Sequence, residues 1–264
     1  MRVFIMTDLE GATGVAGSWE DINPGGRIHE EARRMLTGDV RAAVEGALRG
    51  GASEVVVLDG HGAAFSIILE ELPPAAKLIR GRRILEMEGL DGSFSAVLAV
   101  GAHAMAGAPL ALLCHTLSHS SIVEIRVNGT PVGEVGLWAF IAGSFNVPLA
   151  MVAGDAAAVE EAKELLPGIE GVAVKRATSM YAAECLHPQV SWRLIREAAE
   201  RAVRKAALGD LKPLNPGGEV EVEVVYLLPA DADRVARRPG VKRVDGRTVS
   251  YRGRDVQECL NALL

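Results

Sequence analysis

Residues 2–11 read RVFIMTDLEG, an apolar run that ends in two closely spaced acidic residues. The four apolar residues at 3–6 are typical of a parallel strand that is covered on both faces of its sheet. A helical pattern follows over residues 29–48, and Gly50 and Gly51 end it. A buried strand followed by a helix predicts a βαβ unit, so the chain begins as an α/β protein.

The same alternation of short apolar runs and helical patterns continues almost to residue 211. Further strands are expected at residues 54–58, 77–79, 96–100, 148–152 and 171–175, and further helices at 65–72, 134–145, 156–166 and 188–208. The mostly apolar strands predict burial on both faces. We therefore expect an α/β fold of three layers, with helices on both faces of a mostly parallel sheet.

An uncharged stretch at residues 92–123 is long enough to cross a bilayer. Gly101, Gly107 and Pro109 interrupt it, and its apolar residues fall into two short blocks at 97–100 and 110–113. We interpret these blocks as two buried strands joined by a loop, so no membrane partner is expected.

The pattern changes in two places, near residue 122 and after residue 211. Residues 122–127 alternate in polarity before Asn128-Gly129, which predicts a β-hairpin. A segment rich in proline and glycine at 212–218 is the best candidate boundary. It divides the chain into an α/β domain at residues 1–211 and a small α+β extension at 212–264, with strands expected at 219–228 and 247–251 and a helix at 254–264.

Composition narrows the classes of function. The chain has 264 residues, a formal net charge of −6, 49% hydrophobic and 23% charged residues, which favours a globular protein and disfavours nucleic acid as a partner. Its three cysteines are scattered and form neither a disulfide framework nor a thiolate zinc site. The apolar run at the N-terminus is too short for a signal peptide, so a cytoplasmic location is expected.

Six ionisable residues follow the expected strands or begin an expected helix: Asp8, Glu10, Asp59, His61, His103 and Glu134. Ligands of open α/β sheets bind outside the carboxyl ends of the strands, so these side chains are expected to converge on one site. Each also has a simpler interpretation. Asp8 and Glu10 are compatible with a solvated loop, Asp59 with a turn, and Glu134 with a helix start, while the two histidines are compatible with ordinary loop or core positions.

Charge favours a pair of metal ions at this site. Asp8 and Glu10 lie two residues apart on an extended segment, so both carboxylates point to one side and can hold a cation. With Glu134 they carry about three negative charges, which two divalent cations and a hydroxide would balance. Carboxylates and imidazoles suit zinc or manganese. His115 is the candidate proton-transfer residue and His119 its weaker rival.

Taken in order, several motifs resemble the zinc D-aminopeptidases of the bacterial dipeptide-transport operon. These motifs are TDLEG at 7–11, DGH at 59–61, GAHA at 101–104, HT at 115–116 and NGTPVGEVG at 128–136. The resemblance implies metal ligands at Asp8, Glu10, His61, His103 and Glu134, with Asp8 bridging two zinc ions. It also implies a catalytic His115, a supporting role for Asp59 beside the ligands, and a cytoplasmic homodecameric ring.

The motifs and the resemblance together predict a binuclear zinc aminopeptidase. It would release the N-terminal residue of short peptides, such as those beginning with D-Ala, by metal-activated water with His115 in proton transfer. Selectivity for D-residues comes only from the resemblance. Two other functions are open from the residues alone: a two-metal phosphoesterase, and a non-catalytic module that binds metal or peptide.

Overall fold

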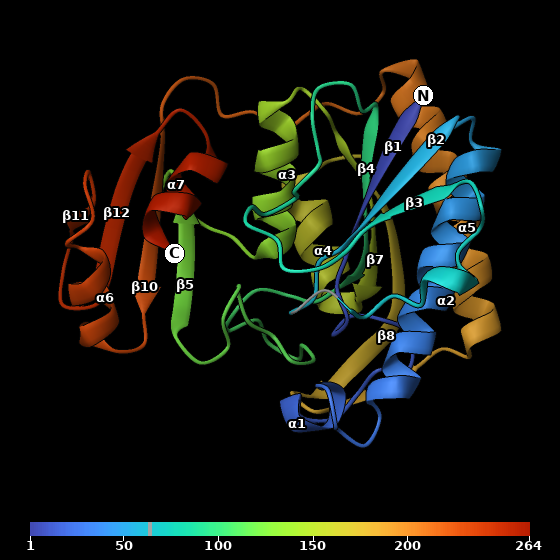
Figure 1. The fold of residues 1–264 in the computed structure, drawn as a ribbon, viewed down its shortest axis with the longest axis horizontal. Helices are drawn as coiled ribbons and strands as arrows, with labels where there is room; N and C mark the ends of the chain where they lie inside the picture. The colour runs from blue at the N-terminus through green and yellow to red at the C-terminus, as the bar shows by residue number, and fades with distance from the viewer. Residues whose placement is uncertain (63–64) are drawn as a thin grey trace.

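Two β-sheets form the frame of the protein in the computed structural model, which describes residues 1–62 and 65–264 (Figure 1). The strand order of the larger sheet is β3-β2-β1-β4-β7-β8-β9. Its strands are β1 (Arg2–Thr7), β2 (Glu54–Asp59), β3 (Ala76–Ile79), β4 (Ala96–Ala102), β7 (Leu149–Asp155), β8 (Glu170–Ser179) and β9 (Ala182–Cys185). All neighbours pair in parallel except β9, which runs antiparallel to β8.

Helices cover both faces of this sheet, so the predicted three-layer α/β fold is confirmed. On one face α2 (His29–Arg49) packs against α5 (Pro188–Leu208), and on the other lie α3 (Glu134–Ser144) and α4 (Ala156–Leu165). Side chains of β1 alternate between the layers: Val3 and Ile5 join the core beneath α2 and α5, and Phe4 and Met6 join the core beneath α3 and α4. This two-sided burial explains the unbroken apolar run at the start of the chain.

The second sheet is antiparallel and has the order β11-β12-β10-β5-β6. Its strands are β5 (Ile122–Val127), β6 (Thr130–Pro131), β10 (Val220–Tyr226), β11 (Lys242–Arg243) and β12 (Thr248–Gly253), with α6 (Pro229–Val235) and α7 (Val256–Leu263) beside them. Strands β5 and β6 form the predicted hairpin. This sheet therefore takes two strands from before residue 212, and the division into residues 1–211 and 212–264 stays a prediction.

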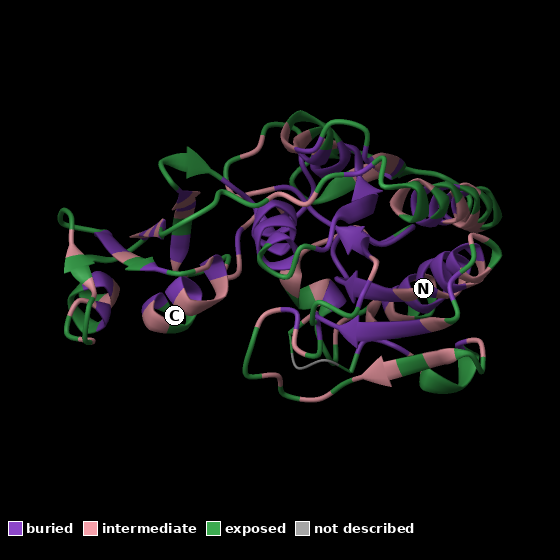
Figure 2. Ribbon diagram, turned by 90° about the horizontal axis from the view of Figure 1, so that it is seen from above, coloured by how far each residue is buried: buried purple, intermediate pink, exposed green. Residues whose placement is uncertain are grey.

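Helix α3 joins the two sheets. It lies between them in Figure 1, and Figure 2 shows it buried along most of its length. One hydrophobic cluster includes Val97 of β4, Trp138 of α3 and Val222 of β10, so both sheets share a core. The shared core holds Glu134, the first residue of α3, at the junction.

Two predicted elements differ in the structure. Residues 110–113 form a loop because Leu110 and Leu113 have φ of +47° and +48°, which no strand adopts. The N–H of Leu112 donates to Asp155 at 3.2 Å, so the loop passes over the end of β7. The helix expected at 65–72 is reduced to a single 3₁₀ turn, Leu69–Glu71. Pro73 disfavours a helical conformation of Leu72, which explains the end of this turn.

Several short elements were not expected from the sequence, among them α1 (Trp19–Ile22), β9, α6 and β11. Each has too few residues to show a period. Among the described residues, no helix combines the length and apolarity needed to span a membrane.

Candidate active site

The carboxyl ends of β1, β2 and β4 lie at one level of the larger sheet. Thr7 pairs with Asp59 of β2 and with Val100 of β4, so the residues that follow these strands come together. Gly101 permits the close approach: its φ is +79°, and a Cβ there would lie 1.8 Å from the carbonyl oxygen of Asp8. The N–H of Asp8 donates to the Val100 carbonyl at 2.9 Å. Backbone geometry thus brings Asp8 next to the segment that carries His103.

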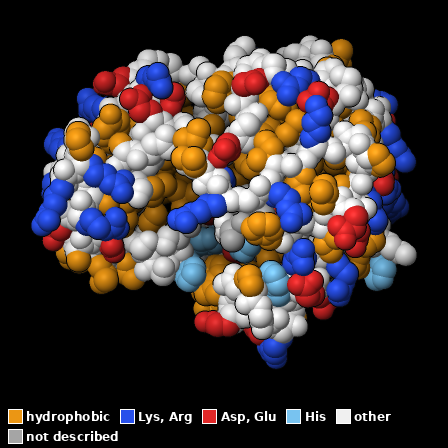
Figure 3. All heavy atoms as spheres, viewed as in Figure 1, with side chains coloured by type: hydrophobic (Ala, Val, Ile, Leu, Met, Phe, Trp, Pro, Cys, Tyr) orange, Lys and Arg blue, Asp and Glu red, His pale blue; other side chains and the backbone are white. Residues whose placement is uncertain are grey.

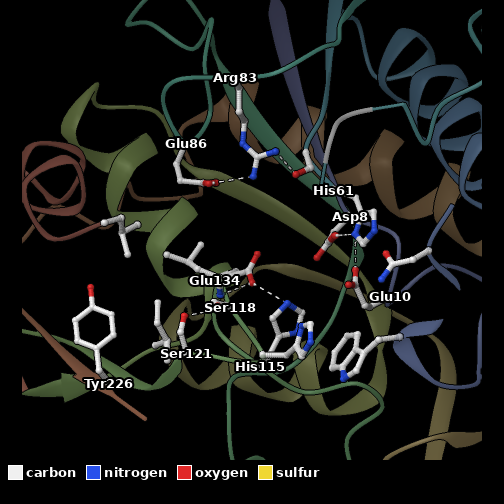
Figure 4. Close-up of a pocket in the computed structure, with 18 of the residues that line it drawn as sticks. Asp8, Glu10, His61, Arg83, Glu86, His115, Ser118, Ser121, Glu134 and Tyr226 are labelled. Atoms are coloured by element: carbon white, nitrogen blue, oxygen red, sulfur yellow. Dashed lines mark hydrogen bonds and ion pairs between the residues drawn. The ribbon is translucent and has the colours of Figure 1, made fainter. Parts of the chain in front are cut away.

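All five residues predicted as metal ligands meet at this edge of the sheet. Figure 4 shows four of them, Asp8, Glu10, His61 and Glu134. Nδ1 of His61 lies 3.1 Å from Oδ1 of Asp8 and 2.9 Å from Oε2 of Glu10. Nε2 of His103 lies 3.0 Å from Oδ2 of Asp8 and 3.3 Å from Oε1 of Glu134. Asp8 therefore lies between two half-sites, one formed with His61 and Glu10 and the other with His103 and Glu134. Each oxygen of Asp8 faces one half-site.

Burial and neighbouring charge shift the pKa values of Asp8, Glu134, His61 and His103 in this cluster. Asp8, Glu10 and Glu134 are all under 9% exposed. Burial acts to raise the pKa values of Asp8 and Glu134. His103 and His61 nevertheless hold the pKa of Asp8 well below its usual range, and His103 and His115 hold that of Glu134 below its usual range. Burial acts to lower the pKa values of His61 and His103, and the carboxylates raise both well above 6.5. Three buried carboxylates around the same two histidines thus require compensating positive charge.

Backbone carbonyls orient two of the imidazoles. Nδ1 of His103 donates to the Ala104 carbonyl at 3.0 Å, and Nδ1 of His115 donates to the Leu113 carbonyl at 2.9 Å. In both rings Nε2 therefore faces the cluster and is free to act as a ligand or base. The two rings stack with their centroids 4.0 Å apart, and Nε2 of His115 lies 3.7 Å from Oε1 of Glu134.

Trp19 of α1 completes the surroundings of His115. Its indole meets the His115 ring edge-on at 5.0 Å between centroids and stacks on His119 at 4.4 Å. His115 is thus packed between His103 and Trp19, whereas His119 lies on Trp19. This arrangement favours His115 over His119 as the residue next to the reacting atoms.

The cluster has the composition of a site for two metal ions. Ligand atoms of Asp8, Glu10 and His103 lie within 4.8 Å of one another, and so do those of His103, His115 and Glu134. Nε2 of His103 is buried close to Oδ2 of Asp8 and Oε1 of Glu134, but it has hydrogen-bond geometry with no described residue, as expected of a nitrogen that would share a metal ion with these oxygens. Carboxylate oxygens and imidazole nitrogens suit zinc and manganese.

Two further acids support the cluster without joining it. Oδ2 of Asp59 accepts from the N–H groups of Ser66 and Ile67 at 2.8 and 3.0 Å, so Asp59 holds the loop that follows His61. Glu161 of α4 accepts from the N–H groups of Met105 and Gly133 at 2.9 and 3.1 Å. Glu161 thereby ties the segment after His103 to the residue before Glu134, a link that no sequence pattern indicated.

Lys175 of β8 anchors the loop that carries Glu10. Its ammonium donates to the backbone carbonyls of Glu10, Ala12 and Val15, the last two at 2.9 and 2.6 Å. The residue is 2% exposed, and burial lowers the pKa of its ammonium to about 8. A buried cation that binds three carbonyls of one loop fixes the course of that loop.

Replacing Lys175 by methionine should destabilise the fold, because three buried carbonyls would lose their donor. We expect a cost of about 3 kcal/mol. For a chain of this size that corresponds to a Tm lower by about 6 to 12 °C, measurable by calorimetry. Lys163→Met is the matched control, since that ammonium is exposed and, among the residues that the structure describes, forms an ion pair only with Glu160, one turn away. An equal Tm for the two variants would contradict the anchoring role.

A cavity of about 480 Å³ opens over the cluster and reaches the second sheet. Asp8, Glu134 and His115 line one part of it, and Tyr226 of β10 lines another. In Figure 3 histidine side chains gather in the hollow between the two halves of the molecule. The volume suits a small ligand of a few residues.

A family model for D-aminopeptidase matches residues 1–264, the whole chain. The chain belongs to the D-aminopeptidase family. It is 33% identical to a D-aminopeptidase of Bacillus subtilis over an alignment of 270 positions, which covers 100% of this chain and 96% of the relative. The predicted family resemblance is therefore confirmed, and the protein is a metallo-aminopeptidase, a hydrolase.

The fold of this D-aminopeptidase family member is shared by a solved structure. The Zn-dependent D-aminopeptidase DppA from Bacillus subtilis, described as a self-compartmentalizing protease, superposes with a TM-score of 0.91 at 30% sequence identity. The match covers 100% of this chain and 95% of that one. The cluster described above thus lies in a chain whose whole architecture is that of a zinc peptidase.

Other residues of the cavity were not found from the sequence: Trp19, Arg83, Glu86, Ser118 and Tyr226. Arg83 and Glu86 lie in a loop without periodicity, and Trp19 lies in a helix of four residues. The one available signal was the cluster of basic residues at 80–83, which has no match to a known motif.

Proposed function

We propose that this protein is a binuclear zinc aminopeptidase that removes the N-terminal residue from short peptides, with D-residues such as D-Ala preferred. The observation that carries the proposal is the position of Asp8, whose two oxygens face two separate sets of ligands. Asp8, Glu10 and His61 would hold one ion, and Asp8, His103 and Glu134 the other. The similarity to a Zn-dependent D-aminopeptidase supports zinc, with manganese as the alternative.

Two bound zinc ions would supply an activated water at neutral pH and polarise the carbonyl of the bond to be cleaved. Residues of the protein would carry out the proton transfers. Nε2 of His115 faces the cavity beside Glu134, so it can take a proton from the attacking water and deliver it to the leaving nitrogen. Packing between His103 and Trp19 holds the ring in place for this transfer.

Hydrolysis of D-Ala-p-nitroanilide tests the proposed substrate class directly. We expect turnover of this compound, slower turnover of the L-enantiomer, and none of p-nitrophenyl phosphate. The phosphate ester tests the phosphoesterase alternative, which the same metal cluster could serve. Turnover of the phosphate ester without that of the peptide analogue would refute the proposal. Elemental analysis of the same preparation should show two zinc ions per chain.

Removal of metal by a chelator is expected to lower the Tm more at pH 8 than at pH 6. Without metal, the carboxylates hold the pKa values of His61 and His103 well above 6.5. A group whose pKa is raised by folding contributes fully to the free energy of unfolding below its unfolded-state pKa. This contribution is lost as pH rises toward the folded-state pKa, at up to about 1.4 kcal/mol per pH unit for each group. The free energy of unfolding of the metal-free protein therefore falls from pH 6 to pH 8. Imidazoles bound to metal are neutral throughout this range, so the metal-bound protein lacks this loss.

Calorimetry at pH 6, 7 and 8 with and without chelator measures this effect. Asp8→Ala is the control: it should show little response to chelator at any pH, because its half-sites have lost their shared ligand. Identical melting curves of the unmodified protein with and without chelator would count against the metal cluster.

We also propose a cytoplasmic homo-oligomer, with a homodecameric ring as the specific assembly. The similar DppA is described as self-compartmentalizing, which supports an assembly of copies. Analytical ultracentrifugation should show a species near ten times the chain mass. A monomer at micromolar concentration would refute this part of the proposal.

A further inference from the structure

An aminopeptidase has to recognise the free α-ammonium group of its substrate, and one acidic residue of the cavity is available for it. Among the described residues that line the cavity, the acidic ones are Asp8, Glu10, Glu86 and Glu134. Three of these belong to the cluster assigned to metal. The fourth, Glu86, lies in the loop between β3 and β4 and takes no part in that cluster.

Glu86 is held in place by one neighbour. Its Oε1 accepts from Nη2 of Arg83 at 3.0 Å, and Nη1 of Arg83 donates to the carbonyl of Gly60, next to His61. The loop is thus tied to the turn that carries a proposed metal ligand. Figure 4 shows Arg83 and Glu86 across the cavity from His115. Two contacts of the Arg83 side chain, one with Glu86 and one with Gly60, therefore fix the position of the Glu86 carboxylate relative to His61.

The second oxygen of Glu86 makes no hydrogen bond with any described residue. The side chain is 14% exposed, and Oε2 is buried. A buried carboxylate oxygen without a donor is costly. Because Oε2 is closed to solvent while the side chain lines the cavity, a turn of the carboxylate toward the cavity would let a donor of the substrate satisfy this oxygen. Burial raises the pKa of Glu86, the Arg83 guanidinium lowers it, and Glu134 and Asp8 raise it again, which places Glu86 within the electrostatic field of the cluster.

We propose that Oε2 of Glu86 binds the α-ammonium group of the substrate and so restricts the enzyme to unblocked amino termini. An ammonium group carries three donors and a positive charge, which an ionised carboxylate binds in a short, charge-assisted hydrogen bond. A carboxylate or phosphate ligand would be repelled at the same point. Arg83 acts as a positioning residue, since its guanidinium is engaged by Glu86 and Gly60. This inference rests on the proposed aminopeptidase function.

Calorimetric binding of two hydroxamates to the zinc-loaded enzyme tests the proposal. D-Alanine hydroxamate and propionohydroxamate differ only in the amino group, and both carry the same metal-binding group. We expect the unmodified enzyme to bind the amino compound about 10- to 100-fold more tightly, the range of a hydrogen bond to a charged group. Glu86→Gln should reduce that ratio at least about tenfold while its Kd for propionohydroxamate stays the same.

Glu88→Gln is the matched control. Glu88 lies in the same loop, where its Oε2 accepts from the N–H of Ile84 at 2.8 Å, and it is not among the residues that line the cavity. This variant should keep the ratio of the unmodified enzyme. If Glu86→Gln loses its fold by circular dichroism, Glu86→Asp replaces it, and its shorter side chain should lower the ratio as well.

Several results would overturn the inference. The ratio in Glu86→Gln could equal that of the unmodified enzyme, which would place the ammonium group elsewhere, for example on a metal ion. Glu88→Gln could lower the ratio equally, which would make the effect a property of the loop. Failure of the proposed function is distinguishable, since the unmodified enzyme would then bind no zinc or leave D-Ala-p-nitroanilide intact, and the role of Glu86 would fall with it.

Discussion

Asp8→Ala is expected to abolish peptide hydrolysis, with kcat/KM lower by at least about three orders of magnitude, because metal ions contribute several kcal/mol of transition-state stabilisation. The physical reason is the shared position of this carboxylate. Oδ1 lies 3.1 Å from His61 and Oδ2 lies 3.0 Å from His103, so one substitution removes a ligand from both half-sites. We expect the zinc content to fall from two ions per chain to less than one.

Glu10→Gln removes a ligand of one half-site, whereas Asp8→Ala removes the ligand that both half-sites share. Among the described residues, the ion-pair contact of Glu10 is with His61, at 2.9 Å, and its ligand atom also lies within 4.8 Å of that of His103. Because Glu10 makes no such direct contact with His103 or Glu134 among the described residues, this variant should keep the ion between those two residues. Zinc per chain, measured by mass spectrometry of the metals, should therefore be close to one for Glu10→Gln. Equal zinc contents for the two variants would contradict the bridging position of Asp8.

His115→Ala is expected to lower kcat about 10²- to 10⁴-fold, the usual contribution of a positioned acid or base. Nε2 of His115 faces the cavity 3.7 Å from Glu134, and the carbonyl of Leu113 fixes the other nitrogen. Because the proposed role is proton transfer, the zinc content should stay at two ions per chain. Steady-state kinetics with D-Ala-p-nitroanilide and metal analysis of the same sample measure both quantities.

His119→Ala provides the comparison for this prediction. Its ring stacks on Trp19 and lies 6.2 Å from His115 between centroids, so its removal should lower kcat less than about tenfold. A larger loss in His119→Ala than in His115→Ala would exchange the two roles. Loss of one zinc ion in His115→Ala would show that His115 is a ligand of the ion near His103 and Glu134.

The strand-end residues could be found from the sequence because parallel strands place their carboxyl ends at one edge. Asp8, His61 and His103 follow three neighbouring strands, and Glu134 begins the helix that packs beside them. Local pattern and the polarity of the sheet were sufficient to bring them together. The same rule included Asp59, whose hydrogen bonds with Ser66 and Ile67 show that it supports a loop.

Other parts of the site depend on contacts between segments far apart in the chain. Lys175 binds the loop at residues 10–15 from a strand more than 150 residues away. Arg83 and Glu86 reach the cavity from a loop whose course is not set by any repeating pattern. Residues 110–113 have the composition of a strand, but a loop conformation brings the N–H of Leu112 to Asp155.

The sequence by itself determined the α/β class, the parallel order of short buried strands and the group of acids and histidines at their ends. These follow from hydrophobic period and strand direction, which are local properties of the chain. Only the tertiary structure decided that the two oxygens of Asp8 face different imidazoles, that β5 pairs with β10 in a second sheet, and that Glu86 lines the cavity. Those facts depend on side-chain orientation and on packing between distant segments, which no local pattern encodes.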